Sequence, residues 1–160
     1  MLKRSKLARV GIKRAIVQPG RKPIKRAVGG SFKPSKGISK LKKELDRLFS
    51  LYIRAKYKKE CYTCGLKSDK LQCGHFVTRQ YLATRWDERN CRPQCSGCNI
   101  WGKGKVFDFE ENLKKELGAE VVEELKNSRH QTLKLKEPYY LENIAKYKAL
   151  VVIHTQTLGQ

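Results

Sequence analysis

The chain has 160 residues, and its 36 Lys and Arg residues against 15 Asp and Glu give a formal net charge of +21. That length fits one modest domain with appendages, and the positive charge favours a polyanionic partner, of which nucleic acid is the commonest. The sequence lacks the roughly 20 consecutive apolar residues of a membrane-spanning helix. We also expect no secretory signal, because no apolar run follows the basic residues 1–10.

The positive charge is concentrated at the N-terminus. Residues 1–40 hold 13 Lys or Arg and no acidic residue, whereas the other 120 hold 23 basic and 15 acidic residues. Glycines and prolines are scattered through residues 1–38, and such a segment cannot bury enough apolar surface to offset the entropy lost on ordering. We therefore expect residues 1–38 to form a disordered basic arm that contacts phosphates, rather than a leader without a role.

A helix is predicted from about residue 40 to residue 59, with Ser39 as its N-cap. Six apolar side chains recur there at helical spacing and make one stripe: Leu41, Leu45, Leu48, Phe49, Tyr52 and Ile53. The stripe favours core packing over a partner groove. We expect the helix to pack against the following segment, which is too small to be stable through hydrophobic burial alone.

Two Cys-x-x-Cys pairs delimit that segment, at Cys61 and Cys64 and at Cys95 and Cys98. Four thiolates suit one closed, structural zinc site, and paired spacing favours metal over a disulfide framework. The roughly 30 residues between the pairs exceed the 15–20 of the common zinc ribbon. That excess leaves room for a β-hairpin and a long loop.

The other two cysteines, Cys73 and Cys91, are interpreted as small buried apolar side chains. A mixed zinc set that includes either of them is less favoured, because it would break one of the two matched pairs. Since side chains alternate along a strand, we expect Cys73 on the same strand face as His75.

The elements between the cysteine pairs are predicted to be a strand, a loop and a second strand, over residues 71–77, 79–85 and 90–94. Asn99 directly follows the second pair and should open a short helix, which Gly102 and Gly104 end by residue 105.

The C-terminal part is predicted to be helical. The expected helices run from the capping box Asp108-x-x-Glu111 to Gly118, over residues 119–127, and from Pro138 to about residue 151. The side chains expected to face inward are Phe109, Leu113, Leu117, Val121, Val122, Leu125, Leu141, Ile144, Tyr147, and Leu150 or Val151.

The order of these parts resembles the HNH nuclease motif on a zinc-braced ββα unit. The blocks Gly74-His75-Phe76, Arg85-Trp86-Asp87-Glu88-Arg89-Asn90 and Pro93-Gln94-Cys95-Ser96-x-Cys98-Asn99 are similar to those of the phage NinG (Rap) recombination endonucleases. The resemblance covers roughly residues 40–150. It implies an α+β nuclease domain over residues 39–154, with a treble-clef, HNH-type ββα-metal zinc module (61–105) and a helical part (106–154).

The resemblance implies a role for each polar residue of the motif. His75 would be the general base rather than a core or ligand histidine, since a neutral imidazole can take a proton from water. Asn90 would hold the loop and orient His75, and Asn99 would offer an amide oxygen to a catalytic Mg²⁺ or Mn²⁺. A metal-binding Asp or His often precedes the base, but here that position is Gly74.

The second protein ligand of this metal therefore stays open. Asp87 and Glu88 are candidates, and the alternative for both is a salt bridge to Arg85 or Arg89. DNA phosphate contacts are expected from basic residues of the loop and of the segment after the second cysteine pair: Arg79, Arg85, Arg89, Lys103 and Lys105.

The sequence therefore predicts a metal-dependent DNA endonuclease that hydrolyses phosphodiester bonds with a His-activated water. A branched substrate, including Holliday junctions and D-loops, follows from the resemblance alone, as does a phage-encoded protein in the host bacterial cytoplasm. A resolvase that cuts two strands symmetrically is expected to form a homodimer, although no self-association patch is evident.

The alternative hypothesis is a non-catalytic zinc-knuckle protein that binds nucleic acid. It explains the charge and the paired cysteines. It does not explain why His75, Asn90 and Asn99 occur in HNH order.

Overall fold

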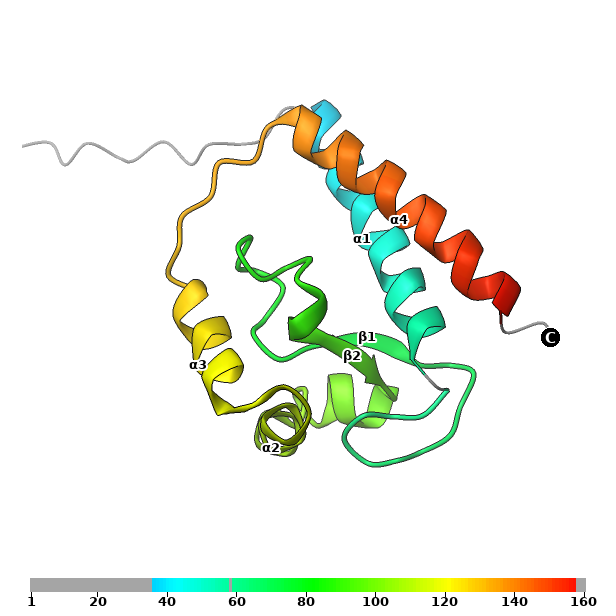
Figure 1. Ribbon diagram of the computed structural model, residues 1–160, viewed down its shortest axis with the longest axis vertical. Coiled ribbons are helices and arrows are strands. Elements are labelled where there is room, and N and C mark those ends of the chain that lie inside the picture. The colour runs from blue at the N-terminus through cyan, green and yellow to red at the C-terminus, as the bar shows by residue number, and fades with distance from the viewer. Residues whose placement is uncertain (1–35, 58, 158–160) are drawn as a thin grey trace, which may run out of the picture. The chain divides into compact units, whose positions relative to one another are not determined.

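The computed structural model describes residues 36–57 and 59–157. Four α-helices and a two-stranded sheet make up most of this described part, which confirms the predicted α+β class (Figure 1). The predicted basic arm lies outside the described residues, except that its last three residues begin helix α1 (Lys36–Lys56). None of the described helices has the length and apolar character needed to cross a membrane.

Helix α1 starts one turn earlier than predicted. Ser39 lies inside the helix and not at its N-cap, because Ile38 packs against the same core as the rest of the apolar stripe and extends the helix backwards. The stripe itself is confirmed, with five of its side chains buried: Leu45, Leu48, Phe49, Tyr52 and Ile53.

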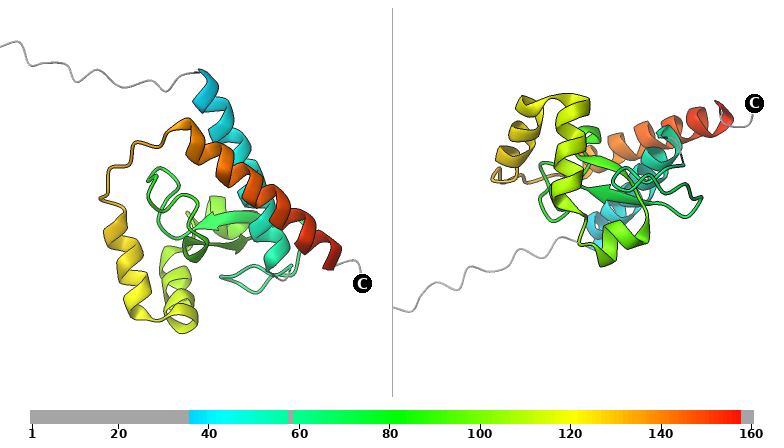
Figure 2. Two further views of the ribbon diagram at one scale, coloured as in Figure 1. Left: turned by 45° about the horizontal axis from the view of Figure 1, so that its top comes forward. Right: turned by 90° about the horizontal axis from the view of Figure 1, so that it is seen from below.

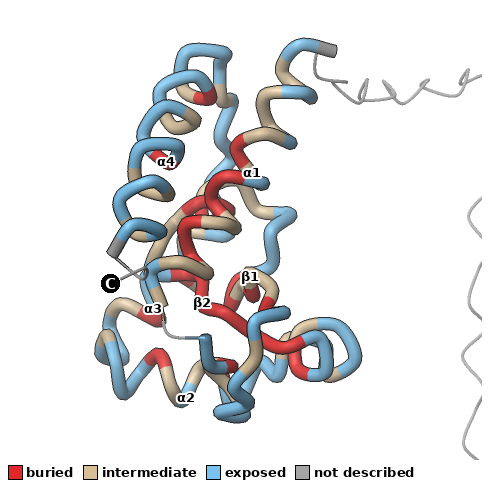
Figure 3. Tube along the Cα trace, turned by 90° about the vertical axis from the view of Figure 1, so that its right-hand side faces the viewer, coloured by how far each residue is buried: buried red, intermediate tan, exposed pale blue. Residues whose placement is uncertain are grey.

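Most of that stripe is covered by helix α4 (Glu137–Thr157). The two helices run side by side in Figures 1 and 2, and the rings of Phe49 and Tyr147 meet edge to face at 5.0 Å. Tyr140 and Tyr147, seven residues apart, are the buried residues of α4, which is exposed along most of its length in Figure 3. Leu141, predicted to face inward, is 50% exposed, because it lies about 100° around the helix from Tyr140.

The sheet is an antiparallel hairpin of β1 (Gln72–His75) and β2 (Cys91–Gln94). Gln72 pairs with Gln94, and His75 pairs with Cys91. Helix α1 also packs on both strands. The first strand is shorter than predicted because the backbone N–H and C=O of Val77 bond to the side chain of Asn90 rather than to a strand. A single turn of 3₁₀-helix, η1 (Glu88–Asn90), leads into β2.

A short π-helical turn, η2 (Gly97–Trp101), follows the hairpin and begins two residues before Asn99. Helix α2 (Val106–Leu117) then starts after Lys105, which has a left-handed backbone conformation with φ of 47°. Asp108 therefore lies within the first turn and does not cap the helix, contrary to the capping-box prediction.

Gly118 ends α2 as predicted, with φ of 90°, and α3 (Ala119–Ser128) begins directly after it. The apolar sides of α2 and α3 meet the end of the hairpin in a second core cluster of six buried side chains: Phe76, Val77, Phe109, Leu113, Val122 and Leu125. This cluster and the α1–α4 core together position the hairpin between two helical layers.

Candidate metal centre and active site

The predicted zinc ligands come together beside the hairpin. The sulfurs of Cys61, Cys64, Cys95 and Cys98 all lie within 4.8 Å of one another, and those of Cys64 and Cys95 are 3.8 Å apart. Each pair is held in a tight turn: Gly65 N–H donates to the Cys61 carbonyl at 2.8 Å, and Cys98 N–H donates to the Cys95 sulfur at 3.4 Å. These four thiols are placed to hold one zinc ion, which binds thiolate sulfur at about 2.3 Å.

Within this cluster, the surroundings of Cys61 favour its thiolate form. Burial acts to raise the pKa of Cys61, but hydrogen bonding to Thr63 and to backbone groups outweighs burial and lowers the pKa to about 6. A backbone hydrogen bond from Leu66 acts to lower the pKa of Cys64, yet contact with Cys61 and burial raise it to about 12. The two shifts have opposite directions because the neighbouring thiols interact, and a bound cation would displace the protons that they carry.

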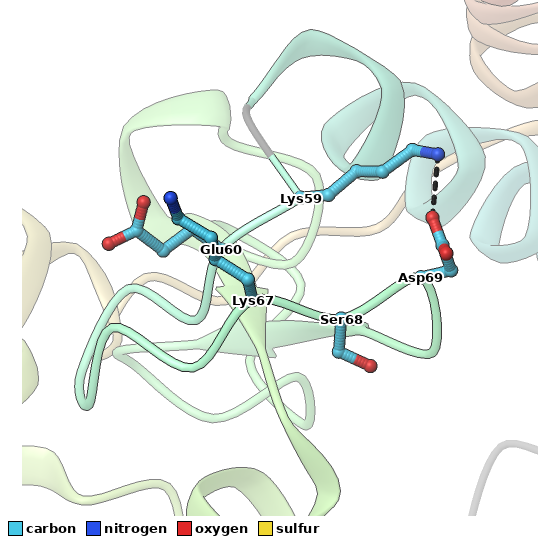
Figure 4. A pocket seen from close by; sticks show the side chains of 5 residues that line it. All are labelled: Lys59, Glu60, Lys67, Ser68 and Asp69. Carbon is cyan, nitrogen blue, oxygen red and sulfur yellow. Dashed lines mark ion pairs between the residues drawn. The ribbon is translucent and has the colours of Figure 1, made fainter.

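A shallow hollow of about 420 Å³ lies beside the first cysteine pair, lined by Lys59, Glu60, Lys67, Ser68 and Asp69 (Figure 4). Figure 4 shows the ion pair between Lys59 and Asp69, whose charged atoms are 2.6 Å apart. None of the predicted catalytic residues lines this hollow.

A second hollow, of about 310 Å³, is lined by two of the candidate catalytic residues, His75 and Asn99. We name it the α1–β1 cleft, and its lining residues are Asp46, Ser50, Arg54, Leu71, Gln72, Cys73, His75, Arg79 and Asn99. The structure thus brings His75 and Asn99 to one cleft, although they lie 24 positions apart in the chain.

His75 is held in one orientation at the end of β1. Its Nε2 lies 3.1 Å from the backbone carbonyl oxygen of Arg85. A carbonyl oxygen can only accept, so Nε2 carries the hydrogen and Nδ1 keeps its lone pair. Burial lowers the pKa of His75 below its usual value of 6.5, although hydrogen bonds to the backbone of Arg85 and of Cys73 act in the opposite direction. The imidazole is therefore neutral at neutral pH and can accept a proton at Nδ1.

Asn90 is fully buried and ties the loop to the second strand. Its Oδ1 accepts from Val77 N–H at 2.7 Å, and its Nδ2 donates to the carbonyls of Val77 and Thr84, each at 2.9 Å. Asn90 therefore ties Val77 and Thr84 to the start of β2, and it makes no direct hydrogen bond to His75. Its effect on His75 passes through the Thr84–Arg85 peptide, whose next carbonyl orients the imidazole.

Asn99 lies on η2 with its amide fixed. Its Nδ2 donates to Gln72 Oε1 at 2.7 Å, which leaves Oδ1 without a hydrogen-bond partner within the described part of the chain. An amide oxygen at the edge of a solvent-open cleft is a ligand that Mg²⁺ and Mn²⁺ accept.

Asp87 and Glu88, the predicted candidates for a second metal ligand, do not line the α1–β1 cleft. Asp87 caps η1 and pairs with Arg89 at 2.8 Å, so its alternative interpretation as a salt bridge is the one observed. Glu88 accepts hydrogen bonds from Tyr52 at 2.7 Å and Lys56 at 2.8 Å. Its partner is thus a lysine of α1 rather than an arginine of the loop.

Arg85 is not available to bind DNA phosphates as predicted. Its side chain is buried, with Nε and Nη2 bonded to the two carboxylate oxygens of Asp46 at 2.8 and 2.6 Å. Its Nη1 donates to the Arg79 carbonyl. Arg89 is similarly committed, since it pairs with Asp87 and with Glu124.

The remaining predicted DNA contacts are exposed basic residues. Arg79 lies at the rim of the α1–β1 cleft, and Lys103 and Lys105 lie in the turn after η2. Both lysines have a left-handed backbone conformation, with φ of 50° and 47°.

Gly74 shows why no carboxylate precedes the candidate base. A Cβ atom at this position would lie 2.1 Å from Gln94 Oε1. Gln94 is itself fully buried, with its Nε2 bonded to the Gly104 carbonyl at 2.9 Å. The space that an Asp or His side chain would need at position 74 is therefore filled from the neighbouring strand.

Three polar residues of α1 belong to the cleft and were missed in the sequence. Asp46, Ser50 and Arg54 recur every four residues, which is the spacing of a single helix face. The apolar stripe of α1 indicated core packing, and this polar stripe beside it was the signal that α1 also borders a site.

The whole chain was compared with known proteins. A model of the family described as bacteriophage lambda NinG protein matches residues 21–155. Over 73 residues the chain is 32% identical to protein ninG of Escherichia phage 933W and to protein ninG of Enterobacteria phage VT2-Sa. Those matches cover 44% of this chain and 36% of each relative. No solved structure matches. Because the family model spans well over half of its residues, the chain belongs to the bacteriophage lambda NinG protein family.

Proposed function

We propose that this protein is a metal-dependent endodeoxyribonuclease of the HNH type that acts on branched DNA during phage recombination, in the host bacterial cytoplasm. One observation carries the proposal: His75, whose pKa is lowered by burial, and Asn99, whose Oδ1 has no hydrogen-bond partner among the described residues, line the same solvent-open cleft. Arg79 at the rim of that cleft adds a positive charge where a phosphate would approach.

In the proposed reaction, a water in the α1–β1 cleft gives a proton to His75 Nδ1 while its oxygen attacks the phosphorus atom. The bond from phosphorus to the leaving deoxyribose oxygen breaks, and that oxygen takes a proton from solvent. Mg²⁺ or Mn²⁺, held by Asn99 Oδ1 with phosphate and water oxygens, would stabilise the charge that develops on the phosphate. The His75 proton then returns to solvent.

Two residues outside this chemistry position the base. Asp46 holds the guanidinium of Arg85 at both carboxylate oxygens, and Asn90 holds the Thr84 carbonyl one residue earlier. Together they fix the Arg85 carbonyl that orients His75. We therefore treat Asp46 and Asn90 as positioning residues.

The turn after η2 supports a substrate with unpaired bases. Trp101 and Phe107 are 83% and 86% exposed, and they flank Lys103 and Lys105 in the sequence. Lysines suit the phosphate backbone, and exposed aromatic rings suit stacking on bases that have left the duplex. Branched DNA offers both features at its branch point.

The alternative function is a non-catalytic zinc-knuckle protein that binds nucleic acid. The four-cysteine cluster is compatible with it, but it gives no role to the cleft.

One assay separates the two functions. Full-length protein is incubated with supercoiled plasmid, linear duplex and a synthetic four-way junction, with Mg²⁺ or Mn²⁺ and with EDTA as the control. The proposal predicts metal-dependent cuts in the junction, and symmetric cuts would require two copies of the chain. Tight binding without cleavage under every condition would favour the non-catalytic alternative.

A further inference from the structure

The hairpin carries a second group of metal-ligating side chains, separate from the four-cysteine cluster. The ligand atoms of Cys73, His75 and Cys91 all lie within 4.8 Å of one another. The strand register explains this meeting. His75 faces Cys91 across the antiparallel pair, and Cys73, two residues before His75, lies on the same face of β1.

We propose that Cys73, His75 and Cys91 form a second binding site, selective for a thiophilic divalent cation such as Zn²⁺, and that its occupation switches off the candidate nuclease. The inhibition rests on the proposed function, whereas the binding does not.

The donor set suits zinc. Two sulfurs and one imidazole nitrogen are a known three-ligand combination for this ion, with the fourth coordination position left open. Metal-binding histidines commonly donate their other ring N–H to a carbonyl or carboxylate, which fixes the ring. His75 already has this support, because its Nε2 contacts the Arg85 carbonyl at 3.1 Å. The remaining nitrogen, Nδ1, is the one available to the cation.

The cation has a route to this site. Cys73 and His75 line the α1–β1 cleft, and Cys91 lies behind them, fully buried. A cation that enters from the cleft therefore meets two of the three ligands first and keeps its open position on the cleft side. Binding displaces the protons of the two thiols into solvent.

The same cleft offers different ligand atoms to two kinds of cation. Mg²⁺ and Mn²⁺ prefer oxygen ligands and would take the Asn99 amide oxygen. Zn²⁺ prefers sulfur and imidazole donors and would take Cys73, His75 and Cys91. Because a coordinated Nδ1 has no lone pair left for a proton, Zn²⁺ at this site would remove the candidate base without removing Mg²⁺ or DNA.

The binding is tested on full-length protein under reducing conditions by equilibrium dialysis against increasing Zn²⁺, with bound metal counted by elemental analysis. Wild type is expected to bind a second equivalent after the four-cysteine cluster fills. Cys73→Ser and Cys91→Ala should each lose that second equivalent while keeping the first. The affinity loss should exceed the roughly 10–100-fold that the removal of a supporting hydrogen-bond partner costs.

Cobalt gives an independent readout, because Co²⁺ bound to thiolate absorbs strongly in the near ultraviolet. Cys73→Ser should lower that absorption in the second half of a Co²⁺ titration only. Circular dichroism checks that both variants fold. If Cys91→Ala does not fold, the test depends on Cys73→Ser alone, because Cys73 is only half-buried. Saturation of wild type at one equivalent, or an unchanged second equivalent in Cys73→Ser, would overturn the proposed site.

The inhibition is tested with junction cleavage at fixed Mg²⁺ and rising Zn²⁺. Wild type should lose activity over the range in which the second equivalent binds, and Cys73→Ser should need at least about tenfold more Zn²⁺ for the same loss. Equal inhibition of both proteins would refute the switch. A wild type that binds two equivalents but never cuts DNA would refute the nuclease proposal and leave the metal site standing.

Discussion

The reactions open to His75 and Asn99 depend on which of their polar side-chain atoms are hydrogen-bonded to neighbouring residues. The carbonyl of Arg85 orients the imidazole of His75, and Gln72 holds the amide nitrogen of Asn99, whose oxygen has no hydrogen-bond partner among the described residues. The motif in the sequence was enough to identify His75, Asn90 and Asn99 as candidates. The hydrogen-bond partners were not predictable, because they come from residues whose closeness depends on the hairpin register and on the loop.

Gly74 is the residue at which packing most clearly restricts the sequence. Gly74→Ala should destabilise the protein by about 1–3 kcal/mol, because the new Cβ would collide with the buried Gln94 side chain. Urea unfolding measures this change. Gly97→Ala is the control, since its Cβ would meet nothing closer than 3.7 Å.

A double-mutant cycle makes this prediction specific. Gly74→Ala combined with Gln94→Ala should be less destabilising than the sum of the two single changes, by about 0.5–3 kcal/mol. Simple additivity would mean that the two side chains do not compete for this space.

Among the elements, helix α1 both packs in the hydrophobic core and borders the α1–β1 cleft. Its apolar stripe was predicted from helical spacing and is buried as expected. Spacing alone could not say what covers the stripe, because periodicity identifies the inward face of a helix but not its neighbour. The cover turned out to be mostly α4, and the adjacent polar stripe of α1 borders the cleft.

The link from α1 to the loop runs through Asp46. Asp46→Asn should destabilise the protein by about 3 kcal/mol, because it leaves the buried Arg85 guanidinium without its countercharge. The Asp46 side chain is 31% exposed, so the loss should not reach the upper end of the range for fully buried pairs. Thermal unfolding of Asp46→Asn beside Glu44→Gln, which breaks an exposed pair with Arg47, gives the comparison. A similar change in both variants would contradict this role of Asp46.

The end of η2, the following turn and the start of α2 form the segment that we link to branched DNA. Trp101→Ala should reduce affinity for a four-way junction by about 1–3 kcal/mol per lost stacking contact and leave affinity for linear duplex nearly unchanged. Leu66→Ala, which removes an exposed apolar side chain elsewhere (54% exposed), is the matched control. Fluorescence anisotropy with both DNAs measures the ratio. An equal loss on both DNAs would argue against base stacking.

Within residues 36–57 and 59–157, three small hydrophobic cores stabilise the fold. One lies between α1 and α4, one under α2 and α3, and one consists of Leu71 with three of the zinc-site cysteines. The third is too small to be stable by burial alone, so we expect its fold to depend on metal. The cysteine spacing correctly predicted that these four thiols meet, because two Cys-x-x-Cys turns are a local feature of the sequence.

Metal removal tests that dependence. Protein purified without added zinc should carry one zinc per chain, and Cys95→Ser should lose both that zinc and the folded hairpin. Elemental analysis and circular dichroism measure the two effects together. Cys73→Ser, outside the four-cysteine cluster, should retain this zinc. Well-folded wild type without any zinc would contradict the structural role of the metal.

The proposed role of His75 as the general base is tested by single-turnover cleavage of a four-way junction. Wild type, His75→Ala and Asn99→Ala are compared across a titration of Mg²⁺ or Mn²⁺, with DNA affinity measured in parallel. His75→Ala should lose roughly 10²–10⁴-fold in rate, keep its zinc and its DNA affinity, and gain nothing from added metal. Asn99→Ala should recover part of its rate as metal increases, because its defect lies in metal binding. Cleavage by His75→Ala at the wild-type rate would place the active site elsewhere and contradict the account.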